Sequence, residues 1–107
     1  MHAVKYTFVG VSGSRCHCEL FDPEIHVKLS THGAVIVVAD APILQPRLRL
    51  AYAVSDLSQA LQEESRNAVR KRYQQADLWF CERYEENSQT RQRLAADLTD
   101  GRYLWVI

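Results

Sequence analysis

Residues 15–29 read RCHCELFDPEIHVKL, and they are the most informative part of the chain for its fold. Polar and apolar side chains alternate over residues 15–20 and again over 24–30, which is typical of strands with one buried and one solvated face. Between the two runs, Asp22-Pro23 has the chemistry of a tight turn. This stretch therefore predicts an antiparallel hairpin.

The length of the connecting loop fixes the expected register of that hairpin. A four-residue loop sets Glu19 opposite His26 and His17 opposite Lys28 on the solvated face. The two cysteines of the first strand then point inward. A slip by one residue would turn every side chain to the wrong face, so this alternation constrains the pairing strongly.

Residues 4–8 alternate in the same manner, and a three-residue loop centred on Gly13 connects them to the strand at 15–20. The resulting register sets Phe8 opposite Cys18, again on the buried face. The first thirty residues thus predict an N-terminal β-meander of three strands.

Two later segments are apolar on both faces, residues 34–39 and 103–107, and such strands are usually covered on both sides. The second follows a helix stop at Asp100-Gly101, so we expect a C-terminal strand. Residues 47–54 fit both a strand and the start of a helix. We favour the strand because their apolar residues alternate.

From Asp56 to Gly101 no glycine or proline interrupts the sequence, and Asp56 with Gln59 resembles a helix-capping box. The apolar stripe changes face along this stretch, which predicts breaks near 63–65 and 87–88. The expected fold is one α+β domain over residues 1–107. It has a mainly antiparallel sheet of five or six strands, with two or three helices packed on one face.

Composition narrows the class of function. The chain has 107 residues, 47% of them hydrophobic, and a formal net charge of zero, so it offers no long-range attraction to nucleic acid or to a membrane. It lacks a signal-peptide pattern, and its cysteine number is odd, which favours free thiols in the cytoplasm. We expect no cofactor, no metal and no catalytic residue.

Several residues could nevertheless carry chemistry. Cys16 and Cys18 point away from His17 on a strand, so the triplet cannot close around a metal ion, and we expect buried thiols. Cys81 has no predicted base beside it. His17 and His26 share the wet face with Lys5, Arg15, Glu19 and Lys28, where we expect a solvated or binding surface rather than acid–base catalysis.

The favoured function is a small, non-catalytic protein–protein interaction module of the accessory or inhibitor type found in bacteria and phages. It rests on two apolar residues off the main helical stripe, which predict an exposed patch. The expected interface consists of Arg72, Leu78, Trp79, Glu82 and Arg83. A homodimer is also allowed, through an outer sheet face formed by Val9, Val11, Ile36 and Val38.

Two alternatives stay open. A nucleic-acid-binding protein would use a basic helix whose charges are Arg66, Arg70, Lys71 and Arg72, although these spread around the helix axis and disfavour that role. A small-molecule-binding domain would need a pocket between sheet and helices. Its expected lining is Tyr6, Tyr52, Tyr73 and Trp105.

Overall fold

The computed structural model describes residues 3–40, 42–64, 76–83 and 85–106, with Glu64 and residues 101–106 described through the backbone alone. Five strands and two helices are formed by these residues. They are β1 (Lys5–Val9), β2 (Arg15–Leu20), β3 (Ala34–Asp40), β4 (Arg47–Val54), α1 (Leu57–Glu64), β5 (Ala76–Glu82) and α3 (Ser88–Val106). The α+β class and the antiparallel sheet are confirmed.

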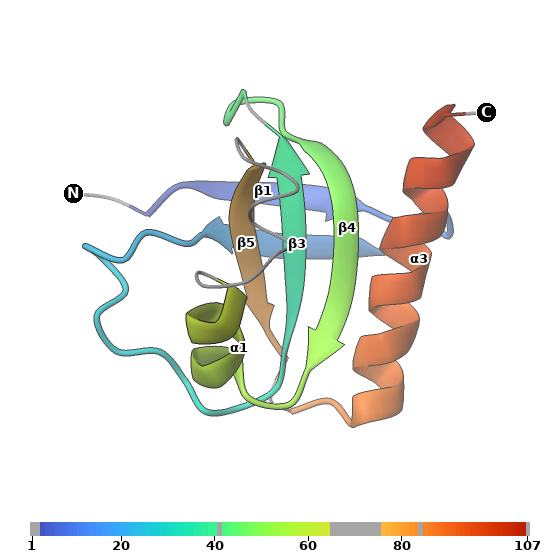
Figure 1. The fold of residues 1–107 in the computed structure, drawn as a ribbon. Coiled ribbons are helices and arrows are strands. Elements are labelled where there is room, and N and C mark those ends of the chain that lie inside the picture. The colour runs from blue at the N-terminus through green and yellow to red at the C-terminus, as the bar shows by residue number, and fades with distance from the viewer. Residues whose placement is uncertain (1–2, 41, 65–75, 84, 107) are drawn as a thin grey trace.

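The strands form one sheet in the order β1-β2-β5-β3-β4, and all neighbours are antiparallel (Figure 1). β5, which comes late in the chain, lies between β2 and β3. The long β2–β3 connection therefore runs beside α1, where the Ser30 and His32 carbonyls accept from the first N–H groups of the helix, instead of forming a tight hairpin. β1 and β4 are the two edge strands.

The β1–β2 hairpin has the predicted buried face, but its register differs by two residues. Cys16 lies opposite Phe8, and Cys18 lies opposite Tyr6. The reason is the position of Gly13, which takes a φ of 88° at the last position of the loop rather than at its centre. A three-residue loop of this kind commonly ends on a left-handed glycine.

The predicted strand at residues 25–29 is wrong, and with it the third strand of the meander. Asp22-Pro23 does open a turn, in which the Asp22 carbonyl accepts from the N–H groups of Ile25 and His26 at 3.1 and 2.8 Å. The next residues leave the sheet, and Val27 is 84% exposed. β5 takes their place beside β2 because its side chains are apolar on both faces.

The helix expected between the breaks near 63–65 and 87–88 is also wrong over its described part, since residues 76–82 form β5. On a helical wheel, Leu78 and Trp79 lie off the apolar stripe. The reason is that they belong to a central strand, which buries the side chains of both its faces. Leu78 packs in the core layer on one side of the sheet and Trp79 in the layer on the other. The segment from 65 to 75 lies outside the described residues.

The C-terminal strand expected at 103–107 is not formed, because α3 continues through Asp100-Gly101 to Val106. α3 packs mainly against β4, so the end of the chain extends a helix beside the sheet instead of adding a strand to it. The predicted break before residue 88 is confirmed. Asn87 caps the helix, its Oδ1 accepting from the Thr90 N–H at 2.8 Å.

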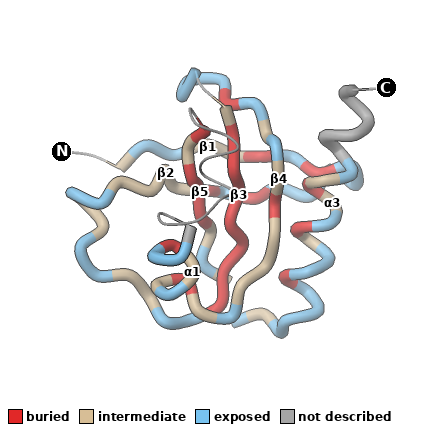
Figure 2. The backbone as a smooth tube through the Cα atoms, in the orientation of Figure 1, coloured by how far each residue is buried: buried red, intermediate tan, exposed pale blue. Residues whose placement is uncertain are grey.

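The helices do not share one face of the sheet. Leu57 and Leu61 of α1 join the core layer of Ile36, whereas Ala95 and Leu98 of α3 join the opposite layer. β3 and β5 are therefore covered on both sides, and they hold most of the buried hydrophobic residues that the structure describes (Figure 2). In the described part of the chain, no helix has the length and apolar character needed to cross a membrane.

Candidate functional site

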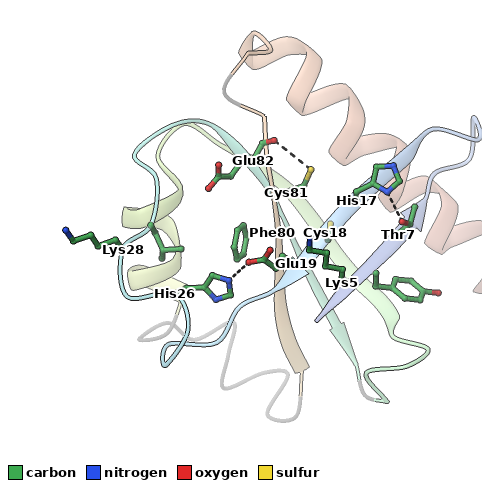
Figure 3. A pocket seen from close by; sticks show the side chains of 12 residues that line it. Lys5, Thr7, His17, Cys18, Glu19, His26, Lys28, Phe80, Cys81 and Glu82 are labelled. Atoms are coloured by element: carbon green, nitrogen blue, oxygen red, sulfur yellow. Dashed lines mark hydrogen bonds and ion pairs between the residues drawn. The ribbon is translucent and has the colours of Figure 1, made fainter. Parts of the chain in front are cut away.

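On the side of the sheet where α1 packs, the part over β1, β2 and β5 that α1 leaves uncovered carries a hollow of about 510 Å³, which we call the β1 groove (Figure 3). Three strands form its floor and the β2–β3 connection forms one wall. Its lining comprises Lys5, Tyr6, Thr7, His17, Cys18, Glu19, His26, Lys28, Leu29, Phe80, Cys81 and Glu82. The structure thus brings together the polar face that sequence reasoning placed around His17 and His26.

His26 is the most firmly held side chain of the β1 groove. Its Nε2 is paired with Glu19 Oε2, and only 10% of the side chain is exposed. Its Nδ1 lies 3.0 Å from the Asp22 nitrogen and 3.1 Å from the Asp22 oxygen. The ring stacks on Phe21 at 5.9 Å and meets the edge of Phe80 at 5.1 Å.

The Glu19–His26 contact was predicted, although for a different reason. It arises because the Asp22 turn folds His26 back over the end of β2, and not because residues 25–29 form a strand beside it. Glu24 N–H donates to Asp22 Oδ1 at 2.9 Å and tightens this turn. The ion pair therefore fastens the β2–β3 connection to the sheet.

The other charged side chains of the groove are available to a ligand. Lys5, Lys28 and Glu82 are exposed, and none of the three makes a side-chain hydrogen bond or ion pair within the described ranges. His17 Nδ1 shares a 2.8 Å hydrogen bond with Thr7 Oγ1. Lys28 extends away from the ion pair in Figure 3, while Lys5 lies over the strands.

Three thiols lie beneath the groove, and the expectation that Cys16 and Cys18 are buried is confirmed. The sulfur atoms of Cys16 and Cys18 are 3.6 Å apart. The hydrogen bond with Cys18, together with burial, raises the pKa of Cys16 to about 12. The hydrogen bond with Cys16, followed by burial, raises the pKa of Cys81. The Cys16 and Cys81 thiols therefore stay protonated at neutral pH and are poor nucleophiles.

A second hollow of about 540 Å³ lies where the β1–β2 turn, the residue after β5, and α3 meet. Asp97 of α3 holds the turn: its carboxylate accepts from the Ser12 N–H at 3.0 Å and from the Ser12 hydroxyl at 2.9 Å. Arg83 Nη1 donates to Glu86 Oε1 at 2.9 Å. Sequence reasoning did not find this hollow, because its residues come from three distant segments.

The interface expected from sequence is only partly assembled. Leu78 and Trp79 are 3% and 0% exposed, so the exposed patch they were thought to form is wrong. Glu82 and Arg83 lie at the surface, in the β1 groove and the second hollow respectively. In the outer sheet face, Ile36 and Val38 are buried, whereas Val9 and Val11 are exposed.

The residues of the two alternatives do not converge where they are described. Tyr6 packs against the α3 side of the sheet and Tyr52 against the α1 side, so they cannot line one pocket. The remaining candidates fall outside the described side chains; they are Arg66, Arg70, Lys71, Arg72, Tyr73 and Trp105. Over the described ranges, no three histidine, cysteine or acidic side chains lie together as metal ligands.

Comparison with known proteins adds no relative to this picture. No protein-family model, curated protein or solved structure matches the chain.

Proposed function

We propose that this chain is a small protein-binding module that takes up an extended segment of a partner protein along β1 and the β1 groove. The observation that carries this proposal is the open edge of β1 beside a groove that holds charges of both signs. The proposal keeps the class of function that the sequence favours and moves its site from residues 72–83 to the β1 face.

The backbone of β1 supports this mode of binding. Leu20 N–H donates to the Val4 carbonyl at 2.8 Å, and Gly10 N–H donates to the Ser14 carbonyl at 2.9 Å. Main-chain groups alternate in direction along a strand, so every second residue from Val4 to Gly10 faces β2. The N–H and C=O groups of the residues between them face away from β2. In the described residues no strand pairs with that side.

An edge of this kind is where an extended peptide adds to a sheet, with main-chain hydrogen bonds giving affinity and alternate side chains giving specificity. Natural edge strands are usually shielded, because an open row of donors and acceptors pairs with other chains. β1 is flanked by exposed aliphatic side chains, since Val4, Val9 and Val11 are 39%, 57% and 47% exposed. These would lie against an added strand.

The charges beside this edge favour a protein segment over a polyanion. Lys5 and Lys28 are balanced by Glu19 and Glu82 in the same groove. A nucleic-acid surface gains its affinity by neutralising many phosphates, which requires one sign of charge. A groove with both signs suits a segment that carries both acidic and basic side chains.

The chemistry of the groove supports binding more than turnover. Both ring nitrogens of His26 are engaged by Glu19 and the Asp22 backbone, so a ligand could reach neither without breaking a contact. The Cys81 thiol has a raised pKa and is no nucleophile at neutral pH. Preorganised side chains of this sort contribute recognition because little ordering is needed on binding.

The test uses a photo-cross-linking amino acid placed at Val9 in the full chain, in the cells that make the protein. We expect a covalent adduct with one other protein. Leu44, which is 92% exposed on the β3–β4 turn, is the control position and should give no such adduct. An adduct between two copies of the chain, no adduct at Val9, or the same adduct from both positions would overturn the proposal.

A second variant separates the edge from its side chains. Thr7→Pro removes an N–H that points away from β2, so the β1–β2 hydrogen bonds survive, but an added strand loses its central donor. Thr7→Ala is the matched control, because it loses the hydroxyl and keeps the N–H. The adduct should disappear with proline and persist with alanine, while circular dichroism and thermal unfolding show both variants folded. An adduct that survives in folded Thr7→Pro contradicts strand addition.

A further inference from the structure

The second hollow collects three arginines from separate elements. Arg15 begins β2, Arg83 follows β5, and Arg93 lies on the first half of α3. Guanidinium groups repel one another when they share a hollow, and this repulsion is relieved when an anion lies between them. The presence of three arginines in one hollow therefore needs a chemical explanation.

The acidic side chains of the hollow do not supply that anion fully. Asp97 accepts from the N–H and hydroxyl of Ser12, and Glu86 Oε1 accepts from Arg83, while Glu86 Oε2 is buried without a partner among the described residues. Within the described residues, the side chains of Arg15 and Arg93 make no hydrogen bond or ion pair. Two exposed guanidinium groups thus face the hollow with all their donors available.

The walls that carry these arginines are fixed before any ligand arrives. Asp97 ties the β1–β2 turn to α3, and the Val11 N–H donates to its main-chain oxygen at 3.2 Å. Arg83 Nη2 lies 3.5 Å from the Arg15 carbonyl and connects the start of β2 to the end of β5. The three arginines consequently stand on a rigid frame, which reduces the entropy lost on binding.

We propose that this hollow binds a phosphate monoester. Guanidinium groups donate paired hydrogen bonds to phosphate oxygens, and a tetrahedral dianion offers acceptors in several directions to arginines from separate elements. A planar carboxylate offers acceptors in fewer directions. The source is either a free small phosphate or a phosphorylated side chain, and the chemistry of recognition is the same. This site is separate from the β1 edge, so it stands or falls independently of the proposed function.

The test is a titration of the full chain with inorganic phosphate, followed by the amide signals of residues 12–15 and 93 in ¹H–¹⁵N NMR spectra. The ionic strength is held constant with sodium chloride. We expect saturable shifts confined to the hollow, and weaker shifts with acetate at equal charge. The absence of saturation over millimolar phosphate, or equal binding of acetate, would overturn the proposal.

Variants identify the donors. Arg15→Gln and Arg93→Gln should each weaken phosphate binding about tenfold, as expected for the loss of one charged hydrogen-bonding group. Arg47→Gln makes the same charge change at the far end of β4 and should bind like the parent chain. Both target residues are exposed, so the folded spectrum should persist. Equal affinity in the double variant would refute the site.

A last arm tells the sources apart. Free O-phosphoserine and a small sugar phosphate are titrated under the same conditions. Tighter binding of phosphoserine than of inorganic phosphate assigns the hollow to a phosphorylated side chain, and tighter binding of the sugar phosphate assigns it to a small metabolite. Loss of binding for both esters, with inorganic phosphate still bound, contradicts a monoester site.

Discussion

Gly10 lies so close to Asp97 of α3 that a Cβ atom at position 10 would stand 1.8 Å from Asp97 Oδ2. The φ of Gly10 is not in the left-handed region, since Gly13 is the only residue with a positive φ in the described part of the chain. The backbone at Gly10 thus tolerates a side chain, and only the Asp97 contact excludes it. The glycine exists to let the β1–β2 turn meet α3.

We therefore predict that Gly10→Ala pushes the Asp97 carboxylate away from Ser12 and lowers the free energy of unfolding by about 1–2 kcal/mol. Urea unfolding measures this, with the slope against urea unchanged. Asp97→Ala should cost a similar amount. In the double variant the two losses should not add, because both remove the same contact. Additive losses would show that Gly10 is required for another reason.

Among the residues whose side chains the structure describes, Arg91 is the one buried charged residue, at 9% exposure. Its Nη1 donates to the carbonyls of Arg83, at 3.2 Å, and Glu86, and thereby joins α3 to the segment after β5. Its guanidinium also packs over Gly33, where a Cβ atom would lie 2.3 Å from Cζ. A planar, forked donor is needed here, and an ammonium group cannot replace it.

Arg91→Lys should therefore lower the free energy of unfolding by about 2–3 kcal/mol, since charged hydrogen bonds to buried carbonyls are lost. Arg93→Lys, two residues along the same helix, is the matched control. Its side chain is exposed, and the expected change is within about 0.5 kcal/mol. Thermal and urea unfolding of both variants give the comparison. Equal effects at the two positions would contradict the role assigned to Arg91.

Trp79 has no exposed surface, and its ring centroid lies 6.2 Å from that of Tyr6 and 5.7 Å from that of Phe8. Trp79→Ala should lower the free energy of unfolding by about 3–5 kcal/mol, which is a large part of the stability of a small domain. Leu44→Ala removes an exposed apolar side chain and should change little. A Trp79→Ala variant as stable as the parent chain would mean that β5 is not in the core.

The local part of the fold could be predicted from sequence. Alternation over 4–8 and 15–20 identified the first hairpin and its buried face, and the apolar run at 34–39 identified a strand covered on both sides. The Asp56 cap is likewise confirmed, because its Oδ1 accepts from the Gln59 N–H at 3.0 Å. In these cases the signal lies within a few neighbouring residues.

The failures came from competition between distant segments. Residues 25–29 alternate well, but β5 buries more apolar surface beside β2 and displaces them. Within β5, Ala76 and Phe80 also fit a helical spacing, and that pattern hid a strand whose adjacent residues Leu78 and Trp79 are buried on opposite faces. The signal against a helix was that two apolar residues, Leu78 and Trp79, lie off the helical stripe.

The candidate site, like the fold, could be predicted from sequence only where the signal is local. The polar face with His17, His26 and Glu19 was predicted, because alternation on β2 fixes which side chains point outward. The open edge of β1 depends on strand order, which local patterns do not determine. The arginine hollow depends on where β5 ends beside β2, and no spacing in the sequence brings Arg15 near Arg83.

Because of the buried thiols, the free energy of unfolding should fall as the pH rises above 9. The pKa of Cys16 is raised from its usual 9.0 to about 12 in the folded chain, by its hydrogen bond with Cys18 and by burial. Below pH 9 both states keep the proton, and the contribution of the thiol is fully present. Between pH 9 and 12 the unfolded chain loses the proton and the folded chain keeps it, so stability falls.

Cys16→Ala should therefore make the free energy of unfolding fall less steeply with pH between 9 and 10.5 than in the parent chain. Each buried thiol contributes at most about 1.4 kcal/mol per pH unit to that slope. Val37→Ala is the matched control, because it opens a cavity in the same core layer without removing a titrating group. It should lower stability at every pH and leave the slope unchanged, as followed by urea unfolding at several pH values. If Cys16→Ala also leaves the slope unchanged, the native thiol ionises as readily as the unfolded one.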